Sequence, residues 1–211
     1  MVRSASPRRS SKPAAPRAWQ RMLSGRRLNL LDPSPLDIEI EDIAHGLARV
    51  ARWNGQTLGT QIYSVAQHSL LVDAIAGHFA PSISQTTRRA VFLHDAAEYV
   101  IGDIISPFKS VIGEAYHETE ARILEAVMRR FDLPAPMTKI AQDLAKKADR
   151  AAAYLEATRL AGFSDEEAGA IFGVPPRFAS PIHSLLTPWH AEEAKSRFLA
   201  RFTELTPDRR A

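Results

Sequence analysis

The stretch HDAAEYVIGD, residues 94–103, decides the fold that we expect for this chain. If residues 85–100 form one helix, His94 and Glu98 lie one turn apart on the same face, with Asp95 on its flank. Imidazole and carboxylate groups suit divalent ions such as Mn²⁺, Co²⁺, Fe²⁺, Ni²⁺ or Zn²⁺. Such ions polarise phosphoryl oxygens and lower the pKa of bound water. The stretch therefore predicts a helical metal site with hydrolytic chemistry.

Apolar residues recur at helical spacing along most of the chain. Ser64 is a plausible N-cap for the second helical segment, and Thr187 for the last one. Residues 102–109 are expected to form a loop, and no strand pattern or internal repeat is visible. The sequence thus predicts an all-α fold with helices over residues 40 to about 53, 64–80, 84–100, 113–131, 137–161, 165–172 and about 188–205.

The chain has 211 residues, of which 45% are hydrophobic, and it contains no cysteine. This length and composition suit one folded domain. The absence of cysteine excludes disulfides, thiolate metal sites and a cysteine nucleophile, and it fits a reducing compartment. No stretch approaches the roughly 18 consecutive apolar residues of a membrane span, and no export signal is present. We therefore expect a cytoplasmic protein with no membrane partner.

Residues 1–27 carry eight basic side chains and no acidic one. Without them the chain has 19 basic and 24 acidic residues, so residues 28–211 do not form a uniformly basic, nucleic-acid-binding domain. The N-terminal segment is rich in Ser, Pro and Arg, and we expect it to be a disordered, solvated tail. The alternatives are a transit peptide, which the prolines disfavour, and a tether to nucleic acid or to an acidic partner.

Two candidate metal ligands lie outside the opening stretch. His68, on an otherwise apolar helix, is either a core histidine or a ligand that joins His94 and Asp95. Asp149, in KKADRAAAYLE, belongs either to a charged solvated face or to the same site, because the neighbouring alanines allow close helix approach. The remaining histidines match no ligand position: His45, His78, His117, His183 and His190.

The order His68, His94-Asp95, Asp149 resembles the H…HD…D signature of the HD-domain metal-dependent phosphohydrolases, over residues 40–160. Within that superfamily, HDAAEYVIGDIISPFK is similar to the branch of 5′-deoxynucleotidases and small deoxynucleoside triphosphate hydrolases. Members of this branch share HDxxE followed by GD, Pro and Lys. The resemblance implies a single HD-domain helical bundle in which these four residues hold one divalent cation between helices, whether Mn, Co, Fe, Ni, Zn or Mg.

The resemblance also implies roles for residues beside the ion. Glu98 and Asp103 become the catalytic carboxylates, with Asp103 assigned as proton donor and Glu98 as the water-orienting group, although the sequence leaves the reverse assignment open. Arg52 would bind phosphate, and Trp53 would pack on sugar or base unless it is an aromatic core anchor. Lys109 resembles a family lysine that holds phosphate, and an exposed loop lysine is the alternative.

The expected activity is hydrolysis of a small nucleotide, with 5′-deoxyribonucleoside monophosphates as the first choice of substrate. A deoxynucleoside triphosphate triphosphohydrolase is the alternative, and a non-catalytic nucleotide-binding sensor is an alternative of a different class. The Gly-Tyr-Pro element of cyclic-dinucleotide phosphodiesterases is absent near the site, which disfavours those substrates. By analogy with the branch we expect a homodimer, and we do not expect nucleic acid as a partner.

Overall fold

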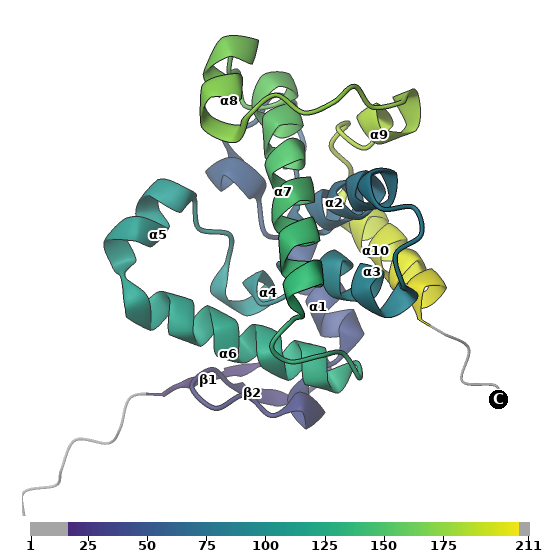
Figure 1. Cartoon of the computed structure of the whole chain (residues 1–211). Helices are drawn as coiled ribbons and strands as arrows, with labels where there is room; N and C mark the ends of the chain where they lie inside the picture. The colour runs from purple at the N-terminus through teal and green to yellow at the C-terminus, as the bar shows by residue number, and fades with distance from the viewer. Residues whose placement is uncertain (1–16, 207–211) are drawn as a thin grey trace, which may run out of the picture.

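The computed structural model describes residues 17–206, and this part of the chain is mostly helical (Figure 1). The all-α class is thereby confirmed, with a small two-stranded sheet as the exception. No helix in the described range is both long and apolar enough to cross a membrane. The described α-helices are α1 (Ile40–Leu47), α2 (Val65–Phe79), α3 (Gln85–Phe92), α4 (Glu98–Ile101), α5 (Ser106–Ile112), α6 (Glu114–Arg130), α7 (Lys139–Arg159), α8 (Asp165–Phe172), α9 (Ser180–Ser184) and α10 (Ala191–Leu205).

Helix α2 lies at the centre of the fold, where it packs against α3, α7 and α10 (Figure 1). Its apolar side chains, such as Leu71, are fully buried. The buried carboxylate of Asp73 accepts hydrogen bonds from Arg88 of α3 at 2.7 Å and from Arg201 of α10 at 2.8 Å. Paired charges of this kind tie three helices together. Because α2 also carries His68, this packing fixes that side chain in the interior.

The predicted helix over residues 84–100 is wrong at its centre, because α3 ends at Phe92 and α4 begins at Glu98. In the turn that joins them, the backbone N–H groups of His94, Ala96 and Glu98 bond to the carbonyl three residues back rather than four. The carbonyl of Val91 accepts from both the backbone N–H and the ring Nδ1 of His94, at 3.2 and 3.0 Å, and so is not available to continue the α-helix. In such turns residues three apart align, so the expected pairing of His94 with Glu98 on one helical face is lost.

Of the two predicted helix N-caps, Ser64 is confirmed and Thr187 is wrong. The side chain of Ser64 accepts a hydrogen bond from the backbone N–H of Gln67, which confirms it as the cap of α2. Thr187 does not cap α10, whose N-cap is His190. The buried amide of Gln67 explains this, because it donates to the Thr187 carbonyl at 2.6 Å and accepts from the Trp189 N–H at 3.1 Å. These bonds hold residues 187–189 outside the helix.

The remaining helices match the prediction in part. The prediction for residues 165–172 matches α8 as observed. The expected loop over residues 102–109 instead contains the start of α5 at Ser106, and α9 was not predicted. The first helix stops at Leu47, and a separate 3-10 turn, η2 (Arg52–Gly55), follows it. A second 3-10 turn, η1 (Pro35–Asp37), precedes α1.

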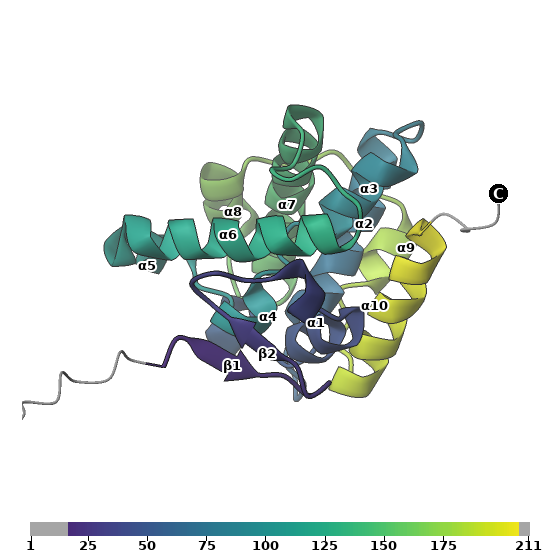
Figure 2. The same ribbon diagram turned by 90° about the horizontal axis from the view of Figure 1, so that it is seen from below.

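The N-terminal segment differs most from the expectation. Residues 1–16 of the predicted disordered tail lie outside the described residues, but the prediction is wrong for residues 17–27. These enter an antiparallel hairpin of β1 (Trp19–Arg21) and β2 (Arg27–Asn29), which Figure 2 shows beside α1.

Contacts with the rest of the fold order this hairpin. Leu28 is fully buried, and the backbone N–H and Oγ of Ser24 donate to Asp42 of α1 at 3.0 and 2.5 Å. The guanidinium of Arg27 lies 4.0 Å from the centroid of the Trp19 ring, within cation–π range. A tertiary carboxylate and one buried leucine thus outweigh a composition that is typical of disorder.

Helix α1 approaches α4 closely at Gly46. A Cβ atom added at Gly46 would lie 2.7 Å from the carbonyl oxygen of Tyr99 and 2.9 Å from its Cβ. Real contacts of this length do not occur without a shift of the backbone. The close approach sets the position of α4, and therefore of Glu98 at its start.

We predict that Gly46→Ala lowers the free energy of unfolding by about 1–3 kcal/mol, because overpacking exceeds the gain in helix propensity. Urea unfolding followed by circular dichroism measures this. Gly169→Ala in α8 is the matched control, since a Cβ there meets only the Val174 side chain, at 3.1 Å. Its stability should stay within about 1 kcal/mol of the wild type. Equal midpoints for both variants and the wild type would contradict the prediction.

Candidate metal centre

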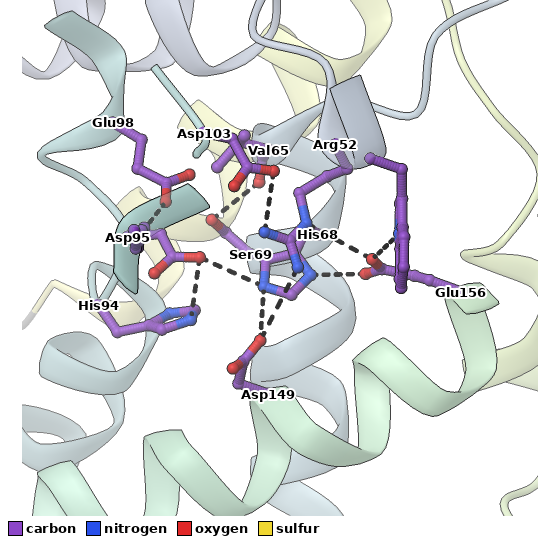
Figure 3. Close-up of polar contacts among 12 residues, drawn as sticks. Arg52, Val65, His68, Ser69, His94, Asp95, Glu98, Asp103, Asp149 and Glu156 are labelled. Carbon is purple, nitrogen blue, oxygen red and sulfur yellow. Dashed lines mark hydrogen bonds and ion pairs between the residues drawn. The ribbon is translucent and has the colours of Figure 1, made fainter. Parts of the chain in front are cut away.

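Side chains from three separate parts of the chain converge at one point (Figure 3). His68 comes from α2, His94 and Asp95 from the turn that follows α3, and Asp149 from α7. One donor atom from each of His68, His94 and Asp149 lies within 4.8 Å of the others. The structure therefore brings together all four residues that the sequence predicted as ligands, and three of them form a possible metal-binding group.

The spacing of the donor atoms suits a divalent ion. His68 Nε2 lies 3.2 Å from Asp149 Oδ1 and 3.4 Å from Asp95 Oδ2, and His94 Nε2 lies 3.3 Å from the same Asp95 oxygen. Ligands that bind one transition ion at about 2.0–2.2 Å lie roughly 3 Å from one another. These three separations are close to what a shared ion requires, and His68, His94 and Asp149 have donor atoms that all lie within 4.8 Å of one another.

The outer ring nitrogens fix how both histidines face this point. His68 Nδ1 lies 2.5 Å from Glu156 Oε1, and His94 Nδ1 lies 3.0 Å from the Val91 carbonyl oxygen. Carboxylate and carbonyl oxygens only accept, so we assign the proton to Nδ1 in both rings. The two Nε2 atoms are buried and have no hydrogen-bond partner. Their lone pairs are therefore free for an ion, as in protein metal sites with this outer support.

The site is closed on one side and open on the other. The His68 side chain is fully buried, whereas the side chains of Asp95 and Asp149 are 22% and 39% exposed. Solvent thus reaches the convergence point past the two carboxylates. An ion or a ligand would enter from this side.

The clustered carboxylates favour positive charge at the histidines. Burial and a nearby guanidinium oppose protonation of His68, yet Glu156, Asp149 and Asp95 outweigh them and raise its pKa well above the usual value. Burial alone would raise the pKa of Asp95, but His94 and His68 hold it well below its usual range. In the absence of an ion, a second proton on His68 Nε2 offsets these carboxylates, and a metal ion bound at that nitrogen would replace this proton.

Glu98 and Asp103 lie beside this cluster with different partners. Burial raises the pKa of Glu98 well above its ordinary value, and the Asp95 and Asp103 carboxylates add to the rise. Burial also raises the pKa of Asp103, although Arg52, whose Nη1 donates to Asp103 Oδ2 at 3.0 Å, opposes the change. Glu98 Oε2 is buried without a hydrogen-bond partner. Carboxyl groups with raised pKa values can donate or accept protons near neutral pH.

The predicted phosphate-binding cations already have protein partners. Arg52 donates through Nη1 to Asp103 and through Nε to Glu156 at 3.4 Å, and its Nη2 lies 4.0 Å from Asp149. Lys109 Nζ lies 2.9 Å from Glu120 and 3.6 Å from Glu98.

These carboxylates raise the pKa of Lys109 despite the opposing effect of burial. Arg52 is not a surface arginine, because its side chain is only 14% exposed.

The Trp53 side chain is anchored by its surroundings. Its Nε1–H donates to Glu156 Oε2 at 2.9 Å, and its ring contacts Phe163 and Phe172 with centroids 5.7 and 6.0 Å away. These contacts fit the alternative in which Trp53 is a core anchor. Trp53 also shares the Glu156 carboxylate with Arg52, so the ring lies next to the site. A contact with sugar or base stays a prediction.

Glu156 is the site residue that sequence reasoning missed. It is fully buried and contacts His68, Arg52 and Trp53 together. The available signal was its position seven residues after Asp149, which places both carboxylates on one face of α7. A lone acid among the surrounding alanines of an apolar helical stretch needed a buried partner.

The chain is 53% identical over 186 residues to an uncharacterized protein of Rhodobacter capsulatus, and the alignment covers 88% of this chain and 94% of that relative. At this identity and coverage, the chain belongs to the same family as the Rhodobacter protein. No family model matches the chain.

We predict that a divalent ion stabilises this protein through the cluster. At a free ion concentration 100 times the Kd, the free energy of unfolding should rise by about 2.7 kcal/mol. Thermal unfolding with Mn²⁺, Co²⁺ or Zn²⁺ measures the rise. His94→Ala should abolish it, whereas the control His117→Ala should keep it, since the His117 side chain is 54% exposed and is not part of the metal-binding group. Equal stabilisation of both variants would refute the site.

Proposed function

We propose that this protein is a metal-dependent phosphohydrolase of the HD type, which removes the 5′-phosphate from deoxyribonucleoside monophosphates. One observation carries the proposal. His68, His94-Asp95 and Asp149, in the chain order of the HD signature, converge, and three separations between their donor atoms are 3.2–3.4 Å. The helical fold supports the proposal, since the ligands come from helices and from a turn between helices.

The proposed division of labour follows from the donor set. An ion held by the four side chains supplies a Lewis acid and an activated water. The protein itself contributes positive charge for the phosphate and carboxylates for proton transfer. Arg52 uses only two of its N–H groups in the observed hydrogen bonds, so others are free for a phosphate oxygen. Lys109, on the short helix α5, is the second cation within reach of the catalytic carboxylates.

Glu98 and Asp103 are the proposed proton-transfer groups. In hydrolysis the attacking water loses a proton, the P–O bond to the nucleoside breaks, and the leaving 5′-oxygen gains a proton. Two carboxylates beside one metal can divide these steps. We retain Asp103 as the donor to the leaving oxygen and Glu98 as the group that orients and deprotonates water.

We expect the purified protein to release phosphate from deoxyribonucleoside monophosphates when Mn²⁺, Co²⁺ or Mg²⁺ is present. Asp95→Ala should abolish release, and Glu98→Gln should lower its rate by ~10²-fold or more. Glu125→Gln, a change on the surface of α6, is the matched control and should be fully active.

The assay panel should include ribonucleotides and triphosphates. Release from triphosphates alone would favour the triphosphohydrolase. A protein that binds metal and nucleotide but releases nothing would be a sensor and would end the proposal.

A second assay assigns the two carboxylates. p-Nitrophenyl phosphate has a good leaving group that needs no proton, unlike the alkoxide of a nucleotide. Asp103→Asn should therefore lose most activity on the nucleotide but little on p-nitrophenyl phosphate, whereas Glu98→Gln should lose activity on both. The opposite pattern would exchange the two roles.

A further inference from the structure

We propose that Glu156 is a positioning residue that couples metal binding at His68 to the placement of the Arg52–Trp53 pair. This inference rests on the proposed function, since it makes one buried carboxylate the link between the ion and the substrate-binding residues. Glu156 itself would contact neither the ion nor the substrate.

The two oxygens of Glu156 face the two halves of the site (Figure 3). Oε1 accepts from His68 Nδ1 at 2.5 Å. Oε2 accepts from Trp53 Nε1 at 2.9 Å and from Arg52 Nε at 3.4 Å. The side chain has no exposed surface, so water does not compete for these bonds. Any movement of this carboxylate is transmitted to both halves.

The turn that carries Arg52 and Trp53 depends on such support. Trp53 and Asn54 adopt left-handed backbone conformations, with φ of 57° and 51°. For a bulky aromatic residue this conformation is an outlier, which persists only where tertiary contacts hold it. Those contacts are the Glu156 hydrogen bond and the rings of Phe163 and Phe172.

Only a carboxylate satisfies all of these donors. His68, Trp53 and Arg52 each present an N–H, and an ionised carboxylate accepts at both oxygens. A glutamine of the same size accepts at one oxygen only, and its amide N–H₂ would face an N–H donor on the other side. With an ion on His68 Nε2 the ring proton stays on Nδ1, so Glu156→Gln must break the contact with His68 or the contact with the turn.

The coupling between ion binding at His68 and phosphate binding at Arg52 should be positive. An ion on Nε2 withdraws electron density from the imidazole, so the Nδ1–H becomes a stronger donor to Glu156. A firmer His68–Glu156 bond fixes the second oxygen for Trp53 and Arg52. By linkage, a phosphate bound at Arg52 raises the affinity for the ion by the same factor by which the ion raises the affinity for phosphate.

The test uses the whole chain and Zn²⁺ alone, with no substrate. In a ¹⁵N-labelled protein the indole N–H resonance of Trp53 should move on titration with Zn²⁺, while those of Trp19 and Trp189 stay fixed. In Glu156→Gln the Zn²⁺ Kd should rise about 10–100-fold, and the Trp53 resonance should no longer respond. Asp143→Asn, an exposed carboxylate on the same helix, is the control and should behave as the wild type.

A double-mutant cycle separates coupling from independent structural effects. Trp53→Phe keeps an aromatic ring but removes the indole N–H, and it leaves the buried His68–Glu156 pair intact. It should weaken Zn²⁺ binding several-fold in the wild-type background and have no further effect in Glu156→Gln. If Glu156→Gln does not fold, the effect of Trp53→Phe on Zn²⁺ affinity still decides, because an unchanged Kd overturns the coupling.

These outcomes are independent of phosphate release. A Trp53 resonance that ignores Zn²⁺, or fully additive effects in the cycle, would refute the coupling even for an active enzyme. A coupled response in a protein that hydrolyses no nucleotide would support the coupling and refute the phosphohydrolase. Failure of the wild type to bind Zn²⁺ would overturn both.

Discussion

The contact between α2 and α7 at His68 is the constraint on which the site depends. His68 meets Glu156 through Nδ1 and Asp149 through Nε2, so one ring spans two carboxylates of the same helix. Buried carboxylates are tolerated only when they are paired, since an unpaired one loses several kcal/mol of hydration. A shift of α7 along α2 would leave Glu156 without a partner in the core. The alanines that flank Asp149 remove the bulk that would hold the helices apart, so the pairing and the packing reinforce each other.

The same pairing supports a strained turn. Left-handed residues such as Trp53 and Asn54 cost about 1–3 kcal/mol each, and the fold retains both. A turn without this strain would direct Arg52 elsewhere, away from Asp103 and Glu156. Strain concentrated beside a cluster of ionisable groups is typical of functional sites, where placement takes precedence over stability.

The sequence patterns predicted the features of the fold and the site that depend on local residue spacing. The apolar period located α2 and α8. The HD motif named His68, His94 and Asp149, whose donor atoms the fold brings together, and Asp95, which contacts both histidines. Patterns did not foresee what depends on contacts across the fold. The ring of His94 takes the Val91 carbonyl and breaks the expected helix, and Asp42 orders a hairpin whose own composition is typical of disorder. Glu156 was missed because its partners lie about a hundred positions away in the chain.

The positive charge of Arg52 allows several carboxylates to lie close together in the site. Its guanidinium lies within 4.0 Å of Asp103, Asp149 and Glu156, and these carboxylates raise its pKa against the opposing effect of burial. The acids are therefore neutralised from two sides, by Arg52 and by the histidines. A phosphate that approaches Arg52 must share the guanidinium with these carboxylates, which weakens its attraction. An ion at the histidines would relieve this competition, because it takes over part of the negative charge that Arg52 offsets and leaves the guanidinium freer to bind phosphate.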